Sequence, residues 1–67
     1  MKNYTNAYDY LISKLVERQE EVGAQIISGR IPTLEEYRRL CGVIQGLDYA
    51  KETVKDLQKR EESDEDE

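Results

Sequence analysis

The sequence predicts an all-α protein: an antiparallel two-helix hairpin with a disordered acidic C-terminal tail. Three observations support this fold class. A helix stop and a helix start lie close together near the middle of the chain, an apolar stripe at helical spacing lies on each side of them, and acidic residues end the chain. We expect a hairpin over residues 1–60, with helices over about 5–28 and 33–60 and a turn over 29–32, followed by a tail over 61–67.

The junction between the two predicted helices combines several turn signals. Gly29 is suited to the left-handed conformation that ends many helices, and Pro32 cannot continue the first helix. Thr33 and Glu36 have the spacing of a capping box, in which each side chain accepts a hydrogen bond from a backbone N–H at the helix start. Because the junction is short, we expect the helices to pack antiparallel.

Apolar residues in the first predicted helix recur every three or four positions, which is the spacing of one helical face. They are Tyr8, Leu11, Leu15, Val22 and Ile26, and Gln19 stands where another apolar residue would fall. Gly23 lies within this helix, where glycine costs about 1 kcal/mol relative to alanine. We interpret Gly23 as a point of close approach to another backbone.

The second predicted helix has a longer stripe, which approaches a coiled-coil heptad. It comprises Tyr37, Leu40, Ile44, Leu47, Ala50, Val54 and Leu57. Each helix therefore has a wider apolar face than one neighbouring helix covers, and we predict a protein interface on the second one. The predicted interface residues are Tyr37, Leu40, Gly42, Ile44, Gly46, Leu47 and Val54.

Gly42, Gly46 and Ala50 place three small residues along one side of the second helix. Two glycines inside a helix cost roughly 2 kcal/mol of helix propensity together, so a compensating contact is expected. The preferred interpretation is a close helix crossing, either with the first helix near Gly23 or with another subunit. The alternative is that both glycines are tolerated without a packing role.

The chain has 67 residues, a size at which a single core supplies only about 3–5 kcal/mol of stability. Small chains commonly gain stability from disulfides, metals or association. Cys41 is the only cysteine and there is no histidine, so an intrachain disulfide and a structural zinc site are both excluded. We therefore expect self-association or docking on a protein partner.

The sequence contains no catalytic or cofactor-binding motif, and we expect a protein that is not an enzyme and uses no cofactor. A nucleophilic Cys41 would lack the usual histidine base, so the role of a small buried apolar residue is favoured. The apolar runs are too short to span a membrane, the N-terminus does not resemble a signal peptide, and a single free cysteine fits a reducing compartment. We expect a soluble intracellular protein.

The net charge of −5 is concentrated at the C-terminus. Residues 61–67 contain six acidic residues and no basic one, which leaves nine acids against ten bases in residues 1–60. Runs of like charge are typical of solvated, disordered ends. Arginines cluster at the hairpin, and Lys51, Lys55 and Lys59 form a row. Acidic residues alternate with these bases, so a solvated face is favoured over direct nucleic-acid binding.

Residues 37–47 form the pattern Tyr-x-x-Leu-x-Gly-x-Ile-x-Gly-Leu, which a charged helix and an acidic end follow. This arrangement resembles small acidic-tailed helical proteins of tailed double-stranded DNA phages. The resemblance covers about residues 32–67. It implies a virion accessory or assembly protein, a class that has no catalytic residues to carry over to this chain.

The first functional hypothesis is a non-enzymatic structural or interaction protein that packs its apolar helix faces into a larger assembly. The resemblance implies a phage capsid, portal or tail as the setting, and therefore the virion or the host cytoplasm. The alternative is a small regulator that inhibits a host or viral nucleic-acid-binding enzyme, with the acidic tail imitating DNA. A third use of the tail is to fold back on the chain's own basic row.

Overall fold

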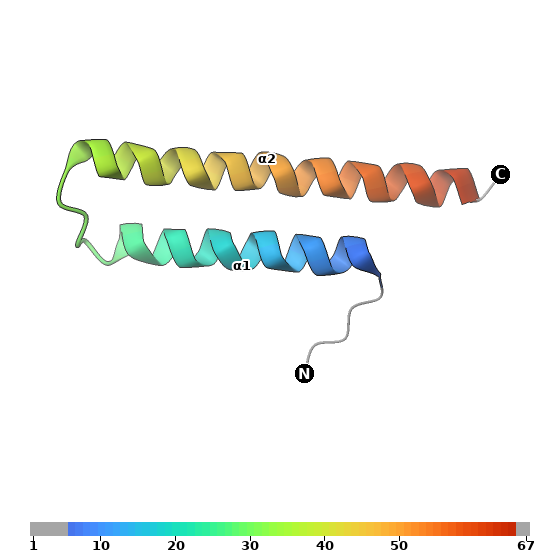
Figure 1. Ribbon diagram of the computed structural model, residues 1–67, viewed down its shortest axis with the longest axis horizontal. Coiled ribbons are helices and arrows are strands. Elements are labelled where there is room, and N and C mark those ends of the chain that lie inside the picture. Colours follow the sequence, from blue (N-terminus) through green and yellow to red (C-terminus); the bar gives the residue numbers. More distant parts are fainter. Residues whose placement is uncertain (1–5, 66–67) are drawn as a thin grey trace.

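The protein is a helical hairpin built from two helices that lie side by side (Figure 1). The computed structural model describes residues 6–65. In this range α1 spans Ala7–Ile27, α2 spans Leu34–Glu65, and there is no strand. The C-terminal turns of α2 extend past the start of α1 (Figure 1). The predicted all-α class and helical hairpin are confirmed.

The two ends of α1 are closed by local hydrogen bonds. Asn6 is the N-cap, and its side-chain oxygen accepts a hydrogen bond from the Asp9 N–H at 2.9 Å. At the other end, the Gly29 N–H donates to the Ile26 carbonyl at 3.3 Å, and Gly29 has a φ of 72°. The expected left-handed glycine is therefore present, because a residue without a Cβ enters this region at no steric cost.

The start of α2 confirms half of the predicted capping box. The Thr33 hydroxyl oxygen accepts a hydrogen bond from the Glu36 N–H at 3.1 Å. The Glu36 carboxylate, however, does not return to the Thr33 backbone. It binds the Arg39 guanidinium through two N–H groups, one of them at 3.0 Å. This outcome has a physical reason, because two hydrogen bonds from a charged donor are stronger than one from a neutral amide.

The buried interior of the hairpin is narrow. In the part of the chain whose side chains are described, residues 6–63, only Val22 and Leu40 are buried, at 1% and 4% exposure. Half-buried apolar residues surround them on both helices. On α1 they include Tyr8, Ile12, Leu15, Val16 and Ile26, and on α2 they include Val43, Ile44, Leu47, Ala50 and Val54.

Two glutamines connect the helices across this interior. The Gln19 amide donates to the Ile44 backbone carbonyl at 3.4 Å, which explains the polar residue within the apolar stripe of α1. The Gln58 amide donates to the Asp9 carboxylate at 3.2 Å near the open end of the hairpin. Each bond satisfies a part-buried polar group, which would otherwise cost free energy.

The C-terminal segment corrects a prediction. The second helix does not end near residue 60, because α2 continues through Glu65. The predicted disorder is therefore wrong for residues 61–65, and residues 66–67 lie outside the described residues. Glutamate is a good helix former, and neither glycine nor proline interrupts this stretch. Glu61 and Tyr8 of α1 line the same shallow pocket, and the interaction of the Tyr8 hydroxyl with the Glu61 carboxylate is the main reason why the pKa of Tyr8 is raised.

Replacing Gly29 and Gly23 by alanine should change stability in opposite directions. Gly29→Ala forces a Cβ into the left-handed region and should cost about 1–2 kcal/mol. In Gly23→Ala the new Cβ meets no atom within 4 Å, so the variant should gain about 1 kcal/mol of helix propensity. Thermal unfolding followed by circular dichroism at one protein concentration measures both. Shifts of the same sign would contradict the assigned roles.

Candidate protein-interaction surface

The predicted interface residues divide between two sides of α2. Four of them are buried or half-buried on the side that contacts α1: Leu40, Ile44, Leu47 and Val54. The other three are exposed: Tyr37, Gly42 and Gly46. The seven residues therefore do not form one patch. The first group already stabilises the hairpin, and the second is free to contact another molecule.

The glycines of the helices do not mark a crossing between α1 and α2. A Cβ built on Gly23, Gly42 or Gly46 would meet no atom within 4 Å. The predicted crossing of the small-residue row with the first helix near Gly23 is therefore wrong. Residues two positions apart point to nearly opposite sides of a helix, so Leu40 can face α1 only if Gly42 faces away. The other predicted crossing, with another subunit, stays a prediction.

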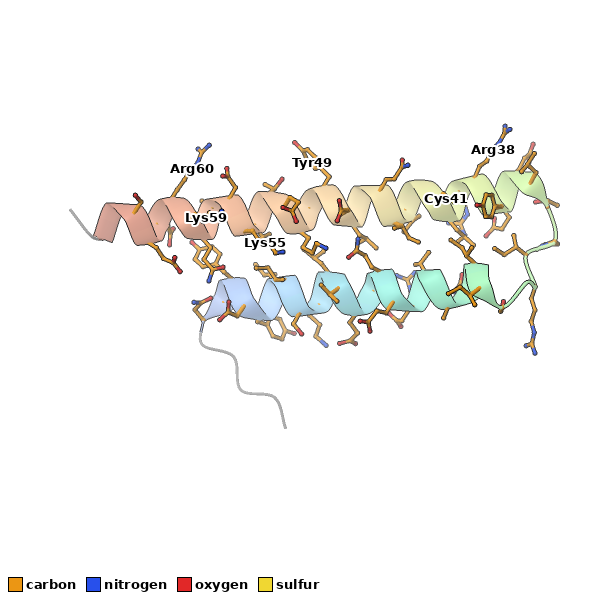
Figure 2. All side chains as sticks on the ribbon, turned by 180° about the vertical axis from the view of Figure 1, so that it is seen from behind. Arg38, Cys41, Tyr49, Lys55, Lys59 and Arg60 are labelled. Carbon is orange, nitrogen blue, oxygen red and sulfur yellow. The ribbon has the colours of Figure 1, made fainter. Side chains whose placement is uncertain are left out.

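Large apolar side chains are exposed on both helices. Seven of them have exposed fractions of at least 44%: Tyr10, Leu11, Ile27, Leu34, Tyr37, Tyr49 and Leu57. Tyr49 is 77% exposed and points away from α1 (Figure 2). Leu34 and Tyr49 are not among the seven predicted interface residues, because both lie outside the apolar stripe of α2. An aromatic side chain outside that stripe is the signal that identifies Tyr49.

A groove of about 480 Å³ lies at the closed end of the hairpin. Its lining is made by Ala24, Gln25, Ser28, Arg30, Ile31, Pro32, Glu36 and Leu40. Ile27 ends α1 and Leu34 begins α2 beside this connection, and they are 87% and 63% exposed. An open groove next to exposed aliphatic side chains is suited to an apolar side chain of a protein partner.

The described residues contain no cluster of histidine, cysteine, aspartate or glutamate that could hold a metal ion. Cys41 is a half-buried free thiol. The interaction of the Tyr37 hydroxyl with this thiol, one turn later on α2, is the main reason why the pKa of Tyr37 is raised. Neither α1 nor α2 is long and apolar enough to cross a membrane.

The ion pairs in the described range each join residues three or four positions apart on one helix. Lys51 pairs with Asp48 at 3.3 Å, and Lys55 pairs with Glu52 at 3.7 Å. Both lysines belong to the predicted basic row. A nucleic-acid phosphate would have to compete with these carboxylates, so the pairs favour the interpretation of a solvated face.

The pair between Glu36 and Arg39 should make the start of α2 sensitive to acid. A hydrogen bond from Arg39 is the main cause of the lowered pKa of Glu36. Because the folded pKa lies below the unfolded one, the stability from this pair is complete above the unfolded pKa and is lost as pH falls through the folded pKa. Arg39→Gln should move the pKa of Glu36 back toward its ordinary value.

Carbon-13 NMR of the side-chain carboxyl groups during an acid titration measures this change. Arg18→Gln is the matched control, because Arg18 pairs with Glu21 on the other helix. It should leave the pKa of Glu36 unchanged. An equal Glu36 pKa in the parent protein and in Arg39→Gln would contradict the assigned interaction.

Comparison with known proteins does not place this chain in a family. No family model matches it, and neither a curated protein nor a solved structure shows significant similarity to it. The surface described above is therefore the basis for assigning a function.

Proposed function

We propose that this protein is a non-enzymatic interaction module, whose hairpin completes its apolar packing against a protein partner in a larger assembly. The observation that carries this proposal is the contrast between interior and surface. Val22 and Leu40 are the only buried side chains of residues 6–63, whereas seven large apolar side chains are exposed by at least 44%. Burial of a large apolar side chain stabilises by about 1.5–3 kcal/mol, so a partner that covers several of them gains substantially.

The setting of this assembly is a separate part of the proposal. The resemblance of residues 32–67 to accessory proteins of tailed phages supports a virion or its assembly intermediates. Capsid, portal and tail proteins are therefore the first partners to test. The residues assigned to a protein contact, with such a partner or with a second copy of this chain, are the exposed members of the predicted interface, Tyr37, Gly42 and Gly46, together with the exposed Tyr49.

The isolated protein should not behave as a self-sufficient monomer. We expect oligomers or partial unfolding at micromolar concentration, because two helices bury too little apolar surface to offset the ordering of the chain. Sedimentation equilibrium gives the mass, and circular dichroism melts over a dilution series give the helix content and the melting temperature. Association would appear as a melting temperature that rises with protein concentration.

One result of these measurements would contradict the expected association. A fully helical monomer with a cooperative melt that dilution does not change would show that the hairpin needs no partner. Deleting residues 63–67 serves as a control, because this variant keeps Glu61 and its contact with Tyr8. Association that survives this deletion supports packing through the helix faces. Loss of association would instead favour a role for the acidic end, as in the regulator hypothesis.

A further inference from the structure

The side of α2 that faces away from α1 carries a second heptad row. Eight residues recur at alternating spacings of four and three, and all eight are exposed. We call this row the outer seam: Glu35, Arg39, Gly42, Gly46, Tyr49, Thr53, Asp56 and Arg60. Figure 2 shows Tyr49 and Arg60 pointing away from α1. Residues at these spacings lie along one side of a helix, so the outer seam is a continuous exposed strip along which a third helix can lie.

The charges of the outer seam are complementary to those of a second outer seam that runs antiparallel to it. In an antiparallel pair of α2 helices with a two-fold axis between residues 47 and 48, Glu35 lies opposite Arg60 of the second copy. In the same register Arg39 lies opposite Asp56. A two-fold axis repeats each contact, which gives four opposite-charge contacts. A parallel pair would instead place each of these charges beside its own copy.

The middle of the outer seam is complementary in size. In this register Tyr49 lies opposite Gly46 of the second copy, and Thr53 lies opposite Gly42. Tyr49 is 77% exposed, and the space at both glycines is open in the single hairpin. The Thr53 hydroxyl already donates to the Tyr49 carbonyl at 2.9 Å, so it needs no partner in the contact. A ring over a glycine gives close packing without a clash.

Apolar residues border the outer seam on one side. Val43, Ala50 and Leu57 each follow a seam residue by one position, and Leu57 is 48% exposed. Near the two-fold axis, Val43 and Ala50 from both copies would meet beside the Tyr49 rings. The contact therefore combines a small and aromatic centre, an apolar border and charged ends, which is the usual order of a protein interface.

The outer seam is long enough for such a contact. It runs from Glu35 to Arg60, about 38 Å of helix at 1.5 Å per residue, and all eight of its residues are exposed. A second hairpin can therefore lie along most of α2.

We propose that the partner of the outer seam is a second copy of this chain, packed antiparallel along α2 to form a four-helix dimer. This inference rests on the proposed function and names its partner. The intrachain pairs remain in place, since Asp56 binds Arg60 at 3.2 Å and can also accept from Arg39 of the second copy. Such networks are more favourable than isolated surface pairs.

Charge reversal tests the register. Glu35→Arg places two like charges opposite each other at both ends of the dimer, and dimerisation should weaken about tenfold at low salt. The double variant Glu35→Arg with Arg60→Glu exchanges the two charges, so it should recover most of the affinity. Glu20→Arg, the same change at an exposed position of α1, should leave the dissociation constant unchanged. Sedimentation equilibrium measures all four proteins.

Gly46→Leu tests the contact of Tyr49 independently of charge. The single hairpin has open space at Gly46, so the variant should fold and gain helix propensity. In the dimer the leucine would collide with Tyr49 of the second copy, and the affinity should fall at least about tenfold. Gly23→Leu on α1 is the matched control and should leave dimerisation unchanged.

The outcomes separate this inference from the proposed function. A stable helical monomer at every concentration would overturn both. A partly unfolded monomer would overturn the proposed dimer, but it would agree with the proposed function, in which the hairpin packs against a different protein. A dimer that Glu35→Arg does not weaken, or that the double variant does not restore, would overturn the antiparallel register.

Discussion

A helix buries one stripe of its surface against one neighbour, and this hairpin has only two helices. The contact between α1 and α2 therefore determines which side chains are buried and which apolar surface remains exposed. It buries Val22 and Leu40 and half-buries the residues around them, while every residue on the far side of α2 stays in water. Adding length to α2 does not relieve this limit, because the added turns have no α1 beside them (Figure 1). The exposed apolar surface is a consequence of the topology.

The turn could be predicted from the sequence because its determinants are local. Gly29, Pro32 and Thr33 act on their own backbone or on a residue three positions away, so their spacing is sufficient. The end of α2 was predicted wrongly because two local signals disagree there. The charge composition of residues 61–67 indicates a disordered segment, whereas glutamate favours helix and neither glycine nor proline interrupts the stretch. Charge composition alone does not decide where a helix ends.

The candidate surface was predictable only in part for a related reason. Spacing alone shows that Tyr37, Leu40, Gly42 and Ile44 lie on a helix, but it does not show where the neighbouring helix is. Once Leu40 faces α1, the directions of the other side chains follow from helix geometry. The glycines then point outward, although their spacing favours a crossing. The ion pairs within each helix do not show which side of the helix is buried, because they form whether or not a neighbouring helix is present.

The bond between the Gln19 amide and the Ile44 carbonyl has a further consequence. Apolar contacts alone allow α1 to shift along α2, because one leucine can take the place of another at little cost in free energy. A hydrogen bond between a particular amide and a particular carbonyl is broken by such a shift. The bond from Gln58 to Asp9 opposes the same shift near the open end of the hairpin. The two helices are therefore locked lengthwise. The position of each side chain of α1 along the hairpin is therefore fixed relative to the side chains of α2, and a binding partner meets one constant arrangement of both.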